Sequence, residues 1–290
     1  MPSFLQILTE IIADLRALIT PSEPTPAPPP SPAPVPSLVP APTPSPAPIP
    51  LFDVTTALAN LIFTKATTYV EYYPSATGPN RVIDAYIGPV SQAQARTNAT
   101  LIIAQAELHG LDLAIMVGEL YDEAHWSADT YNHNLVEHAG VISFDGTDWG
   151  LAENSGVVLK TFPEFAGKTE AEIQTTVMDA SWSIPRYGTV IAGLYAWALK
   201  ELANSDLASQ IKALPAFAVQ ADLTAAELPY WLACGAYNAG SQGVLDVIAA
   251  GGYKVATDPA TGTLTKTEFH YGANIIAFAR QFRPFITAPA

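Results

Sequence analysis

The sequence has few cationic side chains and a single cysteine. Its 290 residues contain 13 Lys and Arg against 27 Asp and Glu, which gives a formal net charge of -14. It has no basic patch and no Arg or Lys interleaved with aromatic residues, so its charge argues against binding to nucleic acid and to anionic membrane surfaces. Cys234 has no partner for an intrachain disulfide, and its apolar neighbours predict a buried, unreactive thiol.

The sequence also lacks a long hydrophobic run and a basic leader. A membrane span needs about 20 predominantly apolar residues, and a secretory signal needs basic residues ahead of an uninterrupted apolar segment. Residues 1–20 meet neither condition, because Glu10, Asp14 and Arg16 interrupt their apolar positions. We therefore expect neither a membrane span nor an export signal. The sequence also has no internal repeat.

Residues 1–20 have instead the pattern of an amphipathic helix. Phe4, Leu8, Ile11 and Leu15 recur at steps of four and three residues, which places them on one face of a helix. An apolar face of this kind needs a partner. We expect it to dock on a groove of another protein or to self-associate in a short coiled coil, and packing against the rest of the chain is the alternative.

A proline-rich segment follows from residue 21 to residue 50. It holds 15 of the 26 prolines, with Ala, Ser, Thr and Val between them. Prolines at this density favour polyproline II, so the segment predicts a semi-rigid tether that spans on the order of 90 Å. A ligand for a groove that binds Pro-x-x-Pro is the alternative, although basic flanking residues are lacking.

Residues 51–290 have the pattern of a folded domain. Hydrophobic residues make up 49% of the whole sequence and aromatic residues 10%, which is enough for a sizeable core. Ala- and Leu-rich segments with helical spacing dominate, and a turn at Asp145 and Gly146 predicts one hairpin in 139–150. The predicted fold class is mainly α with a small β-hairpin. The predicted helices are 54–73, 90–108, 111–126, 169–178, 189–203, 205–214, 224–237, 241–249 and 269–282, and the predicted turns are 251–252 and 259–262.

The predicted helix over 111–126 carries the best candidate for catalysis. Glu123 follows a stripe of apolar residues on the same helical face. A carboxyl at this place would lie beside apolar packing, near the negative end of the helix dipole and one turn after Glu119. All three effects disfavour its ionisation and suit it to donate a proton. The stripe consists of Leu113, Met116, Val117 and Leu120.

Five short motifs resemble those of the lytic transglycosylases and goose-type lysozymes of the lysozyme-like superfamily. The strongest is AYNAG at 236–240, which matches the third motif of that family without change. All five occur in the family's order between residues 111 and 282. The other four are EAHW at 123–126 for E-S-x-F, GLAE at 150–153 for G-L-M-Q, IAGLY at 191–195 for the helical segment before AYNAG, and YGANI at 271–275 for the closing Y-V-x-x-I.

The resemblance implies a lysozyme-like helical domain in residues 51–290. It also implies a muramidase that cleaves the β-1,4 bond between MurNAc and GlcNAc in peptidoglycan glycan strands. Glu123 would be the single catalytic residue: it would protonate the leaving oxygen and then take the 6-hydroxyl proton as a 1,6-anhydro ring closes. We expect no cofactor and no metal. The substrate-binding residues expected on this basis are Trp149, Gly150, Leu151, Glu153, Tyr237, Asn238 and Tyr271.

Two departures from the family's motifs leave an inactive relative open. Ala124 stands where the family has Ser, and Glu153 stands where it has Gln. The first removes a hydroxyl from the expected site, and the second adds a negative charge. A lysozyme-like protein that serves only as a structural or glycan-binding part is therefore the alternative from a different functional class.

A second carboxylate would change the reaction. TDWG at 147–150 resembles the T-D-Y-G of animal-type lysozymes, in which the Asp is the second catalytic group. Asp148 could thus act with Glu123 in a lysozyme-like hydrolysis, and the alternative is an aspartate that only stabilises a turn.

Two other candidate groups fit less well. Glu119 rivals Glu123, but only Glu123 has an aromatic residue three positions later. A cluster of His and Glu side chains offers zinc-ligand chemistry at a spacing that matches no metal pattern, so we expect a solvated polar loop. A metal hydrolase using this cluster would respond to chelators. The cluster consists of His125, His133, Glu137 and His138.

These features together predict a tethered, peptidoglycan-cleaving enzyme. A docking helix, a stiff spacer and a catalytic domain suit a bacteriophage virion protein that opens the cell wall, which would explain the lack of an export signal. An exported bacterial protein of the cell envelope is the alternative.

Overall fold

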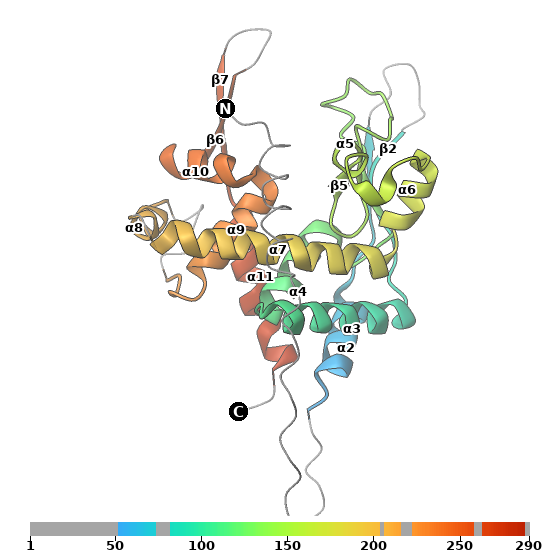
Figure 1. Ribbon diagram of the computed structural model, residues 1–290, viewed down its shortest axis with the longest axis horizontal. Helices are drawn as coiled ribbons and strands as arrows, with labels where there is room; N and C mark the ends of the chain where they lie inside the picture. The colour runs from blue at the N-terminus through green and yellow to red at the C-terminus, as the bar shows by residue number, and fades with distance from the viewer. Residues whose placement is uncertain (1–51, 74–81, 204–205, 216–221, 258–262, 288–290) are drawn as a thin grey trace, which may run out of the picture. The chain divides into compact units, whose positions relative to one another are not determined.

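The computed structural model describes residues 52–73, 82–203, 206–215, 222–257 and 263–287. These residues are mainly helical with a small antiparallel sheet. This confirms the predicted mainly α class with a small β element. Residues Asp53–Ala290 form one compact unit (Figure 1). None of the described helices is long and apolar enough to cross a membrane. The amphipathic helix predicted over 1–20, the tether over 21–50 and the turn over 259–262 lie outside the described residues.

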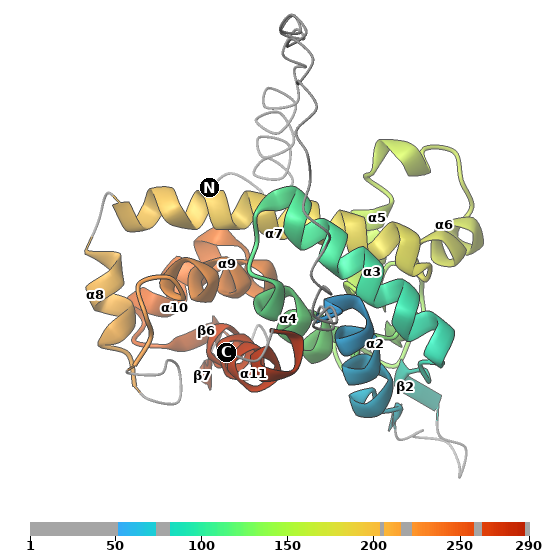
Figure 2. The ribbon, with the colours of Figure 1, turned by 90° about the horizontal axis from the view of Figure 1, so that it is seen from below.

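Helix α4 (Leu113–Ala124) lies in the middle of this unit (Figure 2). Asp112 caps its first turn, because its side chain accepts hydrogen bonds from the Ala114 and Ile115 amides. The predicted apolar stripe is buried, apart from a partly exposed Leu113. Burial also extends beyond the stripe, so α4 is enclosed on most of its surface. The further buried residues are Ala114, Ile115, Gly118, Glu119 and Ala124.

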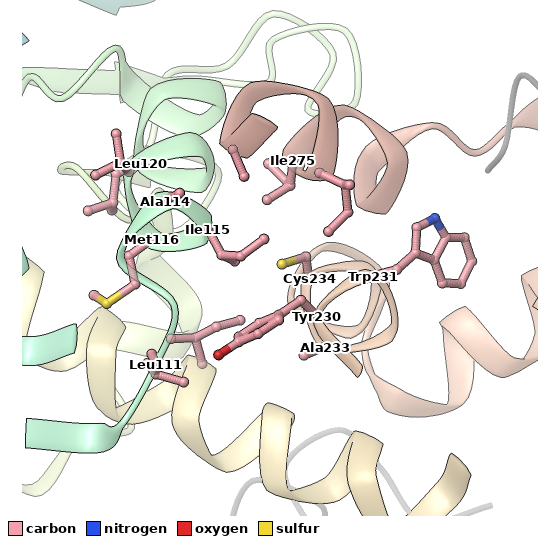
Figure 3. Packing of buried hydrophobic residues seen from close by; sticks show 14 of the residues in the cluster. Leu111, Ala114, Ile115, Met116, Leu120, Tyr230, Trp231, Ala233, Cys234 and Ile275 are labelled. Carbon is pink, nitrogen blue, oxygen red and sulfur yellow. The ribbon is translucent and has the colours of Figure 1, made fainter. Parts of the chain in front are cut away.

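Helix α11 (Tyr271–Ile286) packs most closely against α4. A Cβ added at Gly118 would lie 3.0 Å from the Ala279 backbone nitrogen, so the two helix backbones approach each other where α4 has no side chain. Helix α9 (Leu228–Ala239) supplies Tyr230, Ala233 and Cys234 to the same core (Figure 3).

Three further helices surround this core. Helix α2 (Val54–Lys65) packs on α3 (Gln92–His109), and α3 packs on α7 (Ala180–Ala203). The ends of α3 follow the sequence closely, because Ser91 and Gln94 form a capping box at one end and Gly110 adopts a left-handed conformation at the other. The remaining helical segments are α5 (Gly156–Leu159), the 3-10 turn η1 (Pro163–Phe165), α6 (Glu170–Val177), α8 (Leu207–Lys212) and α10 (Ser241–Ala249).

The larger sheet has five antiparallel strands in chain order. Across it, Tyr86 pairs with Tyr131 and Tyr131 pairs with Trp149. In Figure 1 this sheet lies with α5 and α6 towards one end of α7, while α9 and α10 lie towards the other end. The strands are β1 (Tyr69–Tyr73), β2 (Val82–Ile87), β3 (Thr130–Asn132), β4 (Asp148–Trp149) and β5 (Asn154–Ser155).

The single helix predicted over 54–73 is wrong in its second half. Helix α2 ends at Lys65, and residues from Tyr69 onward form β1. The sequence YVEYY is rich in β-branched and aromatic residues, and it gains a partner only through pairing with β2. Local helical spacing was therefore overridden by a contact made with another segment.

The hairpin predicted in 139–150 is also wrong. Only Asp148 and Trp149 of this stretch form a strand. They pair with β3 and β5, and not with a second strand inside 139–150 as the predicted hairpin would require. Asp145 and Gly146 do form a turn, and it precedes β4 without joining two strands. A second hairpin, β6 (Tyr253–Thr257) with β7 (Leu264–Glu268), was not predicted.

Several helix boundaries differ from the predicted ones. Helix α7 begins at Ala180 and not at residue 189, because the Asp179 side chain accepts from the Ser181 amide and starts the helix earlier. Pro185 lies inside α7, where it removes one backbone donor without ending the helix. Helix α9 begins four residues later than predicted, and α11 continues to Ile286.

Candidate active site

Glu123 and Tyr271 form the centre of the candidate site. Glu123 lies in the last turn of α4, and Tyr271 is the first residue of α11. The Tyr271 hydroxyl donates a hydrogen bond to Glu123 Oε1. Because α11 packs along α4, two side chains that are 148 positions apart in the sequence meet here.

The surroundings of Glu123 favour its protonated form. The residue keeps some exposed surface, yet the protein around its carboxyl raises the pKa of Glu123 well above the ordinary value. Burial is the largest cause, and negative charge on Glu153, Glu119 and Asp122 acts in the same direction. The hydrogen bond from Tyr271 opposes this shift without cancelling it. A carboxyl whose surroundings favour its protonated form is suited to general acid catalysis.

A tight turn that begins at Gly150 carries Glu153. Gly150 has a φ of 75°, and a Cβ there would lie 2.2 Å from the Val177 carbonyl oxygen, so a side chain does not fit. Glu153 is also left-handed, with a φ of 41°, and its amide donates to the Gly150 carbonyl at 2.9 Å. The Tyr237 hydroxyl donates to the Ala152 carbonyl at 2.6 Å, which fixes the turn to α9.

Glu153 and Asp148 extend the acidic site. Burial raises the pKa of Glu153 to about 8, and Asp148 and Asp122 add to that shift. Asp148 lies on β4, where its Oδ2 accepts from Asn134 Nδ2 at 2.8 Å. Burial raises the pKa of Asp148 as well, and this hydrogen bond opposes the rise. Asp148 therefore acts electrostatically on Glu153, which acts in turn on Glu123.

Glu119 lies one turn before Glu123 and is 0% exposed. Its Oε2 accepts from the Tyr187 hydroxyl at 2.5 Å and from Cys234 Sγ at 3.2 Å. Burial raises the pKa of Glu119 to about 7, although both hydrogen bonds oppose the rise. Burial also raises the pKa of the Cys234 thiol, so the prediction that this cysteine is buried is confirmed.

The structure brings five of the expected site residues into one electrostatic and hydrogen-bonded group. Tyr237 reaches this group through the turn, and Tyr271 reaches it directly. Tyr237 and Tyr271 are both partly exposed. The five residues are Glu123, Asp148, Glu153, Tyr237 and Tyr271.

The other expected site residues have structural or peripheral places. Trp149 is 6% exposed, stacks on Phe144 and donates from Nε1 to the Phe144 carbonyl at 3.1 Å, so little of its ring is open to a sugar. Leu151 is fully buried. Asn238 is exposed, and its Oδ1 accepts from Lys254 Nζ at 2.7 Å.

Two histidines of the candidate zinc cluster, His125 and His133, have separate partners. His125 Nδ1 lies 2.6 Å from Thr67 Oγ1, and His133 Nδ1 lies 2.9 Å from Thr147 Oγ1. Among the described residues, no group of three or more His, Cys, Asp or Glu side chains could hold a metal ion. His133 is buried, so the expectation of a solvated loop is wrong for that residue.

Sequence reasoning missed three residues that shape the site. Asp122 could have been found, because it is adjacent to Glu123 and adds a third carboxyl at the end of α4. Tyr187 and Asn134 had no such signal, since each meets its carboxyl only through the packing of a distant segment.

No protein-family model matches this sequence, and no curated protein and no solved structure is significantly similar to it. The function is therefore argued from the chemistry of the site.

Because burial raises the pKa of Glu119, we expect the free energy of unfolding of the protein to depend on pH. Its pKa is raised from 4.5 to about 7, so its contribution to the free energy of unfolding is complete below the lower value and is lost as pH rises through the upper one. Urea unfolding at several pH values should therefore show a loss of stability that Glu119→Gln lacks, on the order of 3 kcal/mol between about pH 5 and 8. The exposed Glu107→Gln on α3 is the matched control and should keep the wild-type slope. Parallel slopes in wild type and Glu119→Gln would contradict the assignment.

Proposed function

We propose that this protein is a peptidoglycan-cleaving muramidase of lytic transglycosylase type, with Glu123 as its acid and base. It cleaves the β-1,4 bond between MurNAc and GlcNAc. One observation carries the proposal: the carboxyl of Glu123, a residue with some exposed surface, lies at the end of a central helix against the hydroxyl of Tyr271, and burial and neighbouring carboxylates raise its pKa. The site therefore offers a proton on a carboxyl whose surroundings suit it to general acid catalysis.

The meeting of distant motifs supports the same proposal. The segments 123–126, 150–153, 236–240 and 271–275 resemble successive motifs of one family, and they are far apart in the sequence. Hydrogen bonds join the second to the third through Tyr237 and the first to the fourth through Tyr271. A shared site gives a physical reason for these motifs to occur in one chain. We base the proposal of a lysozyme-like domain on these contacts and on the order of the motifs.

The reaction follows from the protonation of Glu123. The neutral carboxyl gives its proton to the leaving glycosidic oxygen as the bond breaks, and the sugar ring takes on oxocarbenium character. In the resembled family the N-acetyl group of MurNAc stabilises this centre. The carboxylate of Glu123 then takes the proton of the 6-hydroxyl, whose oxygen closes the 1,6-anhydro ring. The carboxyl is thereby restored without water.

The tether and the N-terminal helix belong to the same proposal. We propose that residues 1–20 attach the enzyme to a protein partner or to copies of itself, and that residues 21–50 hold the catalytic domain away from that attachment. A virion-associated enzyme acting in the bacterial cell wall fits this arrangement, and an exported envelope protein is the alternative.

Asp148 is the reason to keep a hydrolytic mechanism as a second candidate. It is half-buried on β4 and raises the pKa of Glu153, so it belongs to the same acidic group. Its hydrogen bond from Asn134 and its own raised pKa favour a supporting role over that of a free nucleophile. Glu153, where the family has Gln, is the feature that favours an inactive glycan-binding protein.

The first prediction concerns Glu123. Purified protein incubated with peptidoglycan sacculi should release muropeptides with anhydro-muramyl ends, which mass spectrometry separates from reducing ends. Glu123→Gln keeps the shape of the side chain but has no acidic proton, so release should fall by about 10²–10⁴-fold. Glu107→Gln, an exposed residue of α3, should release as much as wild type. No release by wild type would overturn both enzymatic mechanisms, and full activity of Glu123→Gln would overturn the assigned acid.

Asp148→Asn separates the two mechanisms. In transglycosylation Asp148 has no chemical step, so the variant should keep anhydro products and lose less than about tenfold in rate. Hydrolysis through Asp148 predicts reducing ends in wild type and a loss of about 10³-fold or more in the variant. Asp246→Asn on α10 is the matched control, since Asp246 is exposed and its side chain accepts a hydrogen bond from Gln242 of the same helix.

Glu153→Gln tests the electrostatic link to Glu123. Negative charge on Glu153 raises the pKa of Glu123. Removing that charge should lower the pKa of Glu123. The fall in muropeptide release on the alkaline side of the pH profile should then begin at a lower pH than in wild type. An unchanged or higher alkaline limit would show that Glu153 does not act on the acid.

A further inference from the structure

The hairpin of β6 and β7 carries a lysine that the proposed reaction does not use. Lys254 lies on β6, and the hairpin stands beside α10 (Figure 1). The Lys254 ammonium donates to Asn238 Oδ1 at 2.7 Å, and its Nζ lies 5.1 Å from the centre of the Phe269 ring. The ammonium therefore lies between the end of α9 and the residues that lead into α11.

Both partners of Lys254 are adjacent in the sequence to tyrosines of the candidate site. Asn238 directly follows Tyr237, which holds the turn of the second acidic residue to α9. Phe269 precedes Tyr271 by two positions, and Tyr271 donates to the proposed acid. The Lys254 ammonium is thus fixed to the two segments of the chain that supply these tyrosines.

The partners of Lys254 carry no charge. Lys160 lies 2.6 Å from each of two carboxylates, and Arg280 and Arg283 also form ion pairs. Lys254 contacts an amide oxygen and an aromatic face, and within the described residues it forms no ion pair. Although the residue as a whole is exposed, burial around the ammonium lowers the pKa of Lys254. A cation that loses water without gaining a counter-ion is destabilised, and a bound anion would relieve this.

The proposed substrate supplies anions of a suitable kind. Peptidoglycan carries carboxylates, either on the lactyl group of MurNAc or on the peptide attached to it. The protein has a formal net charge of -14 and several carboxyls at the candidate site, so its overall field disfavours the approach of such a strand. A cation fixed beside the site would offset this repulsion and would favour strands that place a carboxylate there.

We propose that Lys254 is a specificity-determining residue that binds a carboxylate of the peptidoglycan strand beside the site of Glu123. An ammonium has three N–H donors, and the bond to Asn238 uses one, which leaves two for a carboxylate. The bond to Asn238 also holds the flexible side chain in one place, so less entropy is lost when the carboxylate binds. This inference rests on the proposed function, because it names a feature of the substrate that the same site recognises.

Lys266 offers a matched control on the same hairpin. It lies opposite Val255 in the ladder, so its side chain is on the other face of the hairpin from that of Lys254. Its Nζ lies 5.9 Å from the centre of the Tyr253 ring. The two lysines are both exposed and lie on paired strands, yet only Lys254 contacts the end of α9.

The test compares wild type, Lys254→Met and Lys266→Met as full chains on two substrates. One is native sacculi, and the other is the same sacculi after carbodiimide coupling to methylamine, which turns carboxylates into neutral amides. On native sacculi, Lys254→Met should raise KM for muropeptide release about three- to tenfold, as expected for a charged contact at a partly exposed site. The kcat should change by less than about twofold. On amidated sacculi the KM values of wild type and Lys254→Met should agree, and Lys266→Met should match wild type on both substrates.

Two results would overturn the proposal. A purely structural role of Lys254, as a support for Asn238 or for the hairpin, would raise KM equally on native and amidated sacculi. A general effect of net charge would raise KM equally in Lys254→Met and Lys266→Met. Lys254→Arg keeps the positive charge and should restore most of the wild-type KM on native sacculi.

A third substrate distinguishes the two sources of the carboxylate. An amidase that removes the peptides leaves glycan strands whose carboxylates are those of the lactyl groups. If the KM difference between wild type and Lys254→Met persists on these strands, Lys254 binds the lactyl carboxylate. If the difference disappears, Lys254 binds a carboxylate of the peptide.

A binding measurement separates this inference from the proposed cleavage. Glu123→Gln and Glu123→Gln/Lys254→Met are mixed with native and with amidated sacculi, and the fraction that co-sediments is measured against sacculus concentration. The apparent Kd should be about three- to tenfold higher in the double variant on native sacculi and equal on amidated sacculi. If wild type releases no muropeptides, the proposed function fails, and this measurement still decides whether Lys254 binds the carboxylates. Equal apparent Kd values on native sacculi would overturn the inference even in an active enzyme.

Discussion

The packing of α11 along α4 is the constraint on which the rest of the site depends. Gly118 lets the two backbones approach, and the same contact carries the first residue of α11 to the last turn of α4. Tyr271 thereby reaches Glu123, although the two residues are 148 positions apart in the sequence. The close approach encloses the carboxyls of α4 as well, so the same packing that builds the core raises their pKa values.

The surroundings of the glutamates shift their pKa values in opposite directions. Glu227 forms an ion pair with Arg280 at 2.7 Å, which lowers its pKa to about 2, whereas burial raises the pKa of Glu153 to about 8. The groups that hydrogen-bond to Glu119, Glu123 and Asp148 are hydroxyls, a thiol and an amide, which donate without adding positive charge. Neutral donors satisfy a carboxyl and still allow it to keep a proton, which a guanidinium would oppose.

The sequence was most informative where local chemistry decides the structure. The ends of α3 follow from a capping box and a left-handed glycine, and the burial of α4 follows from its apolar spacing. It was least informative where a segment is defined by its partner. Local periodicity predicts a helix where strand β1 forms, because its pairing with β2 is not visible in that periodicity. The hairpin predicted around Asp148 does not form, because β4 pairs with β3 and β5. Tyr187 was missed for the same reason.

Glu153 shows how far the motifs determine the site. A left-handed backbone and the Tyr237 bond to Ala152 hold it in place, so the turn would present a side chain here whether the residue were Gln or Glu. Gln would add a neutral amide, whereas Glu adds a charge that raises the pKa of Glu123. Ala124 removes a hydroxyl from the neighbouring position of α4, and the described hydrogen bond to Glu123 comes from Tyr271. The negative charge of Glu153 therefore favours the protonated form of Glu123, which is the form that the proposed reaction needs at its first step.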